Sequence, residues 1–261
     1  MIDPALAQSK RRFASLTPAQ QFYGAPVGIL QLERFPGPFL RPYIPGSVGN
    51  ASTWSVPVRY RTVPGLQFDQ ILGQRAGEMA PAVVQAATDL VREGAQLITS
   101  NCGFMICYQE VVRTALEVPV LLSSLLLAPF LERMLPPGKA LGIITANSRS
   151  LTPDLLEAAG LPANSRRVVV AGLEGACSFA AAFLNASADL DVSAVETEMV
   201  NVATALVGDQ PDIGMLLLEC SELPPYAAAI HRATGLPVFD FTSMVEFFIH
   251  GLIRRPFKGI L

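Results

Sequence analysis

The sequence predicts an α/β protein made of two pseudo-symmetric parallel-sheet domains related by internal duplication. Short apolar runs alternate with amphipathic stretches of helical periodicity, a pattern typical of parallel sheets with helical crossovers. In addition, Cys102 precedes Pro119 by 17 residues, and Cys220 precedes Pro237 by the same 17. Phe130 and Phe248 are separated by the same number of residues as Cys102 and Cys220. Two copies predict a duplicated domain, because a solenoid requires at least three repeats.

The first half is predicted to begin after a polar extension at residues 1–24. The expected strands are the apolar runs at 27–32, 58–63, 97–100 and 118–122, and the expected helices are the amphipathic stretches at 80–93 and 109–116. A Gly/Pro-rich loop at 35–57 separates the first two strands. Loops of this length usually serve as lids or binding loops, and a surface insertion is the alternative.

Composition excludes several classes of protein. Charged residues make up 16% and hydrophobic residues 51%, which excludes intrinsic disorder. The net charge of −3, with no basic run longer than 10–12, argues against a nucleic-acid partner. The longest apolar stretch, 119–131, is too short to span a membrane. Four cysteines and no secretory signal after residue 12 predict a cytoplasmic protein with reduced thiols.

The two matched cysteines are the candidate catalytic residues. Cys102 and Cys220 each end a predicted strand just before a helix, and ligands bind outside the carboxyl ends of such strands. The helix N-terminus favours a thiolate and an anion. Two thiols flanking a small carboxylate suit proton transfer at carbon, in which one removes a proton and the other returns one. Buried cysteines often only fill space, but the matched positions favour a function.

The residues around both cysteines resemble a known group of enzymes. Ser100–Met105 and Leu218–Tyr226 are similar to the two cysteine motifs of the aspartate/glutamate/hydantoin racemase superfamily. The resemblance implies two α/β domains with the active site in the cleft between them, and neither metal nor other cofactor. It also implies that the strand after each cysteine helix joins the other domain. The first domain would then be 25–117 plus 236–261, and the second 118–235.

A narrower resemblance points to the algal dimethylsulfoniopropionate lyases within this superfamily. It is carried by Asn101–Met105, Gln109, Val120–Ser124, Ile144–Leu151 and Leu218–Asp240. It implies that a cysteine abstracts the proton α to a carboxylate and that dimethyl sulfide leaves from the β carbon.

The chain also departs from the racemase pattern. Gly103 and Phe104 replace the Asn and Thr that follow the first cysteine in amino-acid racemases, and Glu222 replaces the histidine of the glutamate racemases.

Further candidates flank the cysteines or end neighbouring strands. By resemblance, Thr145, Asn147 and Ser148 would hold the substrate carboxylate, with helix capping as the alternative for Asn147 and Ser148. Glu222 would contact a substrate cation or cap a helix, whereas Glu219 is expected to face away by strand alternation. The remaining substrate-binding candidates are Asn101, Gly103, Phe104, Ser221 and Tyr60.

These observations predict a cofactor-independent enzyme, most simply an amino-acid racemase of the aspartate/glutamate type, acting on a small carboxylate or zwitterion. The alternatives are a dimethylsulfoniopropionate lyase, a malonate-type decarboxylase and a protein that binds carboxylates without turnover. We expect no nucleic-acid or membrane partner. We also expect a homo-oligomer, a dimer or tetramer, since closed symmetric assemblies are the commonest.

Overall fold

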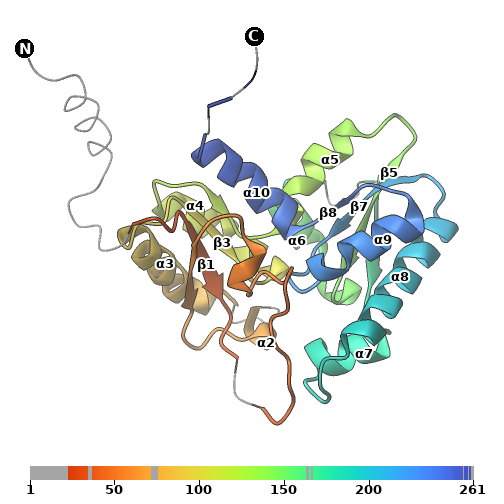
Figure 1. Cartoon of the computed structure of the whole chain (residues 1–261), viewed down its shortest axis with the longest axis horizontal. Helices are drawn as coiled ribbons and strands as arrows, with labels where there is room; N and C mark the ends of the chain where they lie inside the picture. The colour runs from red at the N-terminus through yellow and green to blue at the C-terminus, as the bar shows by residue number, and fades with distance from the viewer. Residues whose placement is uncertain are drawn as a thin grey trace, which may run out of the picture.

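The chain folds into two four-stranded parallel sheets that lie side by side, each flanked by helices (Figure 1). This computed structural model describes residues 23–34, 37–71, 76–162, 165, 167–254, 256–257 and 259. Most of the extension predicted at 1–24 lies outside the described residues. In the described part, no helix has the length and apolarity needed to cross a membrane.

Corresponding strands occupy corresponding places in the two sheets. The orders are β2-β1-β3-β4 and β6-β5-β7-β8, and all neighbours pair in parallel. The strands are β1 Val27–Gln31, β2 Val58–Thr62, β3 Leu97–Ser100, β4 Val120–Leu121, β5 Ala140–Thr145, β6 Val168–Gly172, β7 Ile213–Leu218 and β8 Val238–Phe239. The predicted fold class of two pseudo-symmetric α/β units is confirmed.

The helices predicted in the first half are present as α3 and α4, with α3 beginning at Ala76 rather than at residue 80. The α-helices are α2 Phe68–Ile71, α3 Ala76–Arg92, α4 Gln109–Ala115, α5 Ala128–Met134, α6 Pro153–Ala158, α7 Cys177–Phe179, α8 Val192–Asp209, α9 Ala227–Thr234 and α10 Phe241–Leu252. Short 3-10 turns are η1 Ala51–Thr53, η2 Gly103–Tyr108, η3 Ser124–Leu127, η4 Ser148–Ser150 and η6 Pro224–Tyr226, and η5 Ala180–Leu184 is a π-helical turn.

Side-chain alternation along the central strands builds apolar core on both faces of each sheet. In β1, Leu30 packs in one cluster with α3, whereas Val27 and Ile29 pack on the other face with α10. In β5, Ile144 packs with α8 and α9, whereas Ile143 packs in the cluster that includes α5. Each sheet is therefore covered on one face by a helix of its own half and on the other by a helix that follows the last strand of the opposite half.

The chain crosses between the halves one element later than the resemblance implies. β4 pairs with β3 in the first sheet, and β8 pairs with β7 in the second. The expectation that these strands exchange sheets is therefore wrong, and the domain bounds at 117/118 and 235/236 stay a prediction. A strand that follows a strand–helix unit returns beside the strand it left. The next helix crosses instead, so that α5 packs on the second sheet and α10 on the first (Figure 1).

The long loop predicted at 35–57 reaches from the first half to the second. The Leu40 N–H donates to Asp189 Oδ1 at 2.7 Å, and the Leu40 carbonyl accepts from the Leu190 N–H at 2.9 Å. Arg41 also donates to the Ala182 carbonyl. The described part of the loop thus bridges the two halves beside the ends of their strands, which favours the binding-loop interpretation over a surface insertion.

Candidate active site

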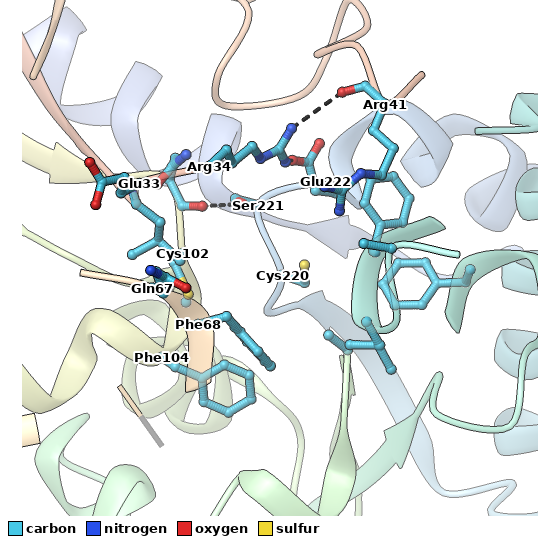
Figure 2. Close-up of a pocket in the computed structure, with 18 of the residues that line it drawn as sticks. Glu33, Arg34, Arg41, Gln67, Phe68, Cys102, Phe104, Cys220, Ser221 and Glu222 are labelled. Atoms are coloured by element: carbon cyan, nitrogen blue, oxygen red, sulfur yellow. Dashed lines mark hydrogen bonds and ion pairs between the residues drawn. The ribbon is translucent and has the colours of Figure 1, made fainter. Parts of the chain in front are cut away.

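A cavity of about 490 Å³ lies between the two halves, beyond the carboxyl ends of β3 and β7. Both cysteine motifs line it, through Asn101, Cys102, Gly103, Phe104, Glu219, Cys220, Ser221 and Glu222. Segments around Arg34, Arg41, Phe68 and Phe183 complete the wall. Figure 2 shows Cys102 and Cys220 on two sides of this cavity, as the duplication predicts.

Cys102 lies two residues after the end of β3 and is the N-cap residue of η2. The backbone N–H groups of Phe104 and Met105 interact with its sulfur and favour the thiolate. Burial, followed by the negative charge of Glu219, nevertheless raises the pKa of Cys102 above its ordinary value. Cys102 is therefore a thiol at neutral pH and needs a proton acceptor before it can act as a base.

Cys220 lies two residues after the end of β7, as Cys102 does after β3. The backbone N–H of Glu222 interacts with its sulfur, but burial, followed by the negative charge of Glu219, raises the pKa of Cys220 well above its ordinary value. Cys220 therefore also stays protonated and presents a neutral S–H group to the cavity.

Glu219 lines the cavity, contrary to the expectation that it faces away. Strand alternation fails as a guide here because β7 ends at Leu218. The carboxylate is fully buried, and Thr145 Oγ1 donates to its Oε2 at 2.8 Å. Burial raises the pKa of Glu219 to about 7, against the opposing effect of that hydrogen bond.

Glu222 pairs with a guanidinium of the protein itself. Arg34 Nη2 lies 2.6 Å from Glu222 Oε1, and the Arg34 guanidinium stacks 4.0 Å from the centre of the Tyr43 ring. The Tyr43 hydroxyl accepts from Asn101 Nδ2 at 3.0 Å, while Asn101 Oδ1 accepts from the Leu32 N–H. This network joins the long loop to both cysteine motifs, and Arg34 already compensates the charge of Glu222, while its predicted contact with a substrate cation stays a prediction.

Arg41 differs from Arg34 in its pairing. It lines the cavity and donates from Nη1 to the Ala182 carbonyl at 3.2 Å. Among the described side chains, none forms an ion pair with Arg41 in this structure. Arg41 can therefore donate to a carboxylate.

Four phenylalanines give the cavity an aromatic wall. Phe68 and Phe104 make an edge contact at 5.7 Å between ring centres, and Phe179 and Phe183 lie 5.0 Å apart. Phe183 belongs to the π-helical turn η5, which lies beside the Arg41 contact. Aromatic faces attract cations, so this wall suits a positively charged group without hydrogen-bond donors.

Four of the predicted substrate-binding residues do not line the cavity. Thr145 is connected to the cavity through its hydrogen bond to Glu219. Asn147 caps η4 by accepting from the Arg149 N–H, and Ser148 Oγ donates to Glu174 at 2.5 Å. The Tyr60 hydroxyl donates to the Val48 carbonyl at 2.9 Å within the apolar cluster beneath α10. The capping alternative therefore describes Asn147 best.

Several residues of the site were missed by sequence reasoning. Arg34 immediately precedes the loop interpreted as a binding loop and Arg41 lies within it, and these basic residues were a usable signal for a carboxylate ligand. Phe179 and Phe183 carry no such signal, since they come from an alanine-rich stretch with no counterpart in the first half. In the described part of the chain, no group of three or more His, Cys, Asp or Glu side chains is placed to hold a metal ion.

Gly103→Ala is expected to lower both stability and activity. A Cβ at this position would overlap with Glu219 Oε1 and lie 2.5 Å from the Glu219 carbonyl oxygen. Either η2 or the carboxylate must shift, which costs about 1–3 kcal/mol and lowers Tm by several degrees. Thermal unfolding measures this effect, with Gly175→Ala as the control because a Cβ there meets nothing within 4 Å. Equal Tm values for the two variants would contradict the close packing of Gly103 and Glu219.

Comparison with known proteins separates sequence relatives from fold relatives. The chain is 32% identical over 244 residues to a dimethylsulfoniopropionate lyase of Durusdinium sp. clade D, covering 90% of this chain and 78% of that protein. It is 31% identical over 246 residues to dimethylsulfoniopropionate lyase 7 of Emiliania huxleyi, covering 90% and 69%. No family model matches the chain.

Solved structures with the same fold are more distant in sequence. A glutamate racemase of Bacillus anthracis superposes with a TM-score of 0.56 at 14% identity, covering 87% of this chain and 81% of that one. The aspartate racemase of Picrophilus torridus gives 0.53 at 14%, covering 90% and 96%, and the allantoin racemase of Pseudomonas fluorescens gives 0.53 at 17%, covering 90% and 99%. These likenesses establish the racemase fold, and the sequence relatives are more specific: the chain belongs to the dimethylsulfoniopropionate lyase family.

Proposed function

We propose that this protein is a lyase that cleaves dimethylsulfoniopropionate, or a close onium analogue, into acrylate and dimethyl sulfide. The observation that carries the proposal is the composition of the cavity, in which two thiols face a space bounded by aromatic rings and by Arg41. A guanidinium that forms no ion pair with the described side chains suits one substrate carboxylate. The phenylalanines suit a sulfonium group, which carries a positive charge but no N–H to satisfy. The lyases among the sequence relatives add to this support.

The reaction needs one base near the carbon next to the carboxylate. The Cys102 thiolate takes the α-proton and becomes a thiol. The electron pair of the C–H bond forms the double bond of acrylate, while the bond between the β carbon and sulfur breaks and releases neutral dimethyl sulfide. The leaving group needs no proton, so a single base is sufficient. Arg41 holds the carboxylate throughout, and the backbone N–H groups around the cysteines stabilise charge that develops in the transition state.

An amino-acid racemase is the second candidate, favoured by the two thiols on different sides of the cavity (Figure 2). A substrate such as aspartate would bring a second carboxylate and an ammonium group. Arg34 is already paired with Glu222, and the facing wall is aromatic. These contacts fit a dicarboxylic amino acid less well than a substrate with one carboxylate and one onium group.

The deciding experiment is proton NMR in deuterium oxide with reduced protein, together with headspace analysis for dimethyl sulfide. Acrylate and dimethyl sulfide from dimethylsulfoniopropionate would support the lyase. Loss of an α-proton signal from aspartate or glutamate, without a new product, would support the racemase instead. Unchanged spectra with dimethylsulfoniopropionate and with both amino acids would exclude the lyase and the racemase alike.

Arg41→Gln is expected to raise KM for dimethylsulfoniopropionate about 10- to 100-fold, since a charge-assisted hydrogen bond contributes about 1.5–3 kcal/mol. The value of kcat should change less, because Arg41 binds the carboxylate in both the ground state and the transition state. Steady-state kinetics and product inhibition by acrylate measure the effect. The control is Arg92→Gln, an exposed position on α3. Unchanged KM in Arg41→Gln would remove Arg41 from the carboxylate site.

A further inference from the structure

Glu219 is a buried carboxylate that the elimination step above does not use. It follows β7 directly and lines the same cavity as both thiols. Its backbone is held in place from the other half, because Ser124 Oγ, which follows β4, donates to the carbonyl oxygens of Leu218 and Glu219. Glu219 therefore sits at the junction of the two halves.

The two oxygens of this carboxylate have different surroundings. Oε2 accepts from Thr145 Oγ1 at 2.8 Å. Oε1 is buried and has no hydrogen-bond partner among the residues that the structure describes. It lies against Gly103, where a Cβ would overlap with it, and Gly103 is the residue next to Cys102. A buried oxygen without a partner is costly unless its site has a use for it.

We propose that Glu219 accepts the thiol proton of Cys102 through Oε1 and so generates the thiolate that takes the α-proton of the substrate. The inference rests on the proposed lyase function for the identity of the substrate, but not for the proton transfer itself. Glu219 acts through Cys102 and is therefore a positioning residue for the reaction rather than a group that reacts with substrate.

The protons balance over one turnover. The S–H bond of Cys102 breaks and an O–H bond forms at Glu219. The thiolate then takes the α-proton of the substrate, which restores the S–H bond as acrylate and dimethyl sulfide are released. Protonated Glu219 passes its proton to water, and this proton is the one that the elimination produces overall.

The electrostatics of the cavity agree with this exchange. Burial raises the pKa of Glu219 to about 7, so that both of its protonation states are accessible near neutrality. Its negative charge, after burial, raises the pKa of Cys102, so that the proton rests on the thiol until Glu219 accepts it. The other titratable or charged groups that line the cavity are Glu33, Arg34, Arg41, Cys220 and Glu222.

The test is the rate at which iodoacetamide alkylates Cys102, followed by mass spectrometry as a function of pH, in the wild type and in Glu219→Gln. The wild-type rate should rise as pH increases through about 7. In Glu219→Gln this rise in rate near pH 7 should be absent. Cys102 should then be alkylated at least about tenfold more slowly at pH 7.5, since thiolate is the reactive form. Cys177, which is exposed, is the internal control for the reagent.

The opposite result has a definite meaning. If Glu219 acted only as a nearby negative charge, its removal would stabilise the thiolate, and Glu219→Gln would be alkylated faster than the wild type. Faster or unchanged alkylation therefore overturns the proposal. Because this assay uses no substrate, it stands even if the wild type releases no dimethyl sulfide, which would overturn the proposed function instead.

Two further variants cover the case in which Glu219→Gln does not fold. Thr145→Val keeps the carboxylate but removes the hydrogen bond that lowers the pKa of Glu219, so the step in alkylation should move to higher pH. Glu219→Asp keeps an acid at the position and should retain the step at a lower rate. If both variants keep the wild-type profile, the proposal is wrong. With substrate, Glu219→Gln should lose about 100-fold in kcat and little in KM.

Discussion

Cys102→Ala is expected to lower the release of dimethyl sulfide by about three orders of magnitude, because it removes the only base proposed to reach the α-proton. The same variant should abolish exchange of that proton with deuterium oxide. Binding should persist, since Arg41 and the aromatic wall are unchanged. Cys102→Ser should be as inactive as alanine, since a hydroxyl is a far weaker acid than a thiol.

The control for this prediction must show that the Cys102→Ala variant remains folded. Cys102 is buried in the large core cluster, so loss of its sulfur leaves a small cavity and lowers Tm slightly. Cys107→Ala, five residues further on in η2, makes a comparable change without removing a site thiol. If Cys107→Ala retains activity and Cys102→Ala loses it, the loss is due to removal of the base and not to reduced stability. Substantial turnover by Cys102→Ala would exclude this cysteine as the base.

The repeated parts of the fold were predictable because their signals are local. The apolar runs that became β1, β2 and β3 lie close to their predicted places, and Cys102 and Cys220 follow the matched strands β3 and β7 at the same distance. Periodicity and spacing carry such information directly. The place where the chain crosses was taken from the resemblance and is wrong by one element, and β4 and β8, only two residues long, offered no local signal to correct it. Nothing local in such a short strand indicates which sheet it joins.

The residues that make the cavity specific depend on tertiary contacts instead. Glu219 was expected to face away because alternation was extended beyond the last residue of β7. Glu222 was expected to contact a substrate cation or to cap a helix, and its pairing with Arg34, 188 positions away in sequence, was not anticipated. Pairings of this range arise only when the long loop closes over both cysteine motifs. The sequence therefore identifies the thiol chemistry more readily than the side chains that select a substrate.

Cys220→Ala is expected to lower kcat about 100-fold, through loss of a hydrogen-bond donor rather than of a base. Burial, followed by the charge of Glu219, keeps the pKa of Cys220 well above its ordinary value, so its S–H stays protonated and faces the cavity. There it can donate to charge that develops on the substrate. Cys220→Ser keeps a donor at this position and should recover much of the activity.

The serine variants therefore separate the two candidate reactions. In a lyase with one base, Cys220→Ser stays active whereas Cys102→Ser does not, because only Cys102 must ionise. In a two-thiol racemase both cysteines exchange protons with carbon, so either serine should abolish inversion. Rates of dimethyl sulfide release and of α-proton exchange, measured on the same preparations, decide between these outcomes. Equal loss in both serine variants would contradict the asymmetric roles assigned to the thiols, and it would mean that the matched positions of Cys102 and Cys220 reflect matched chemistry.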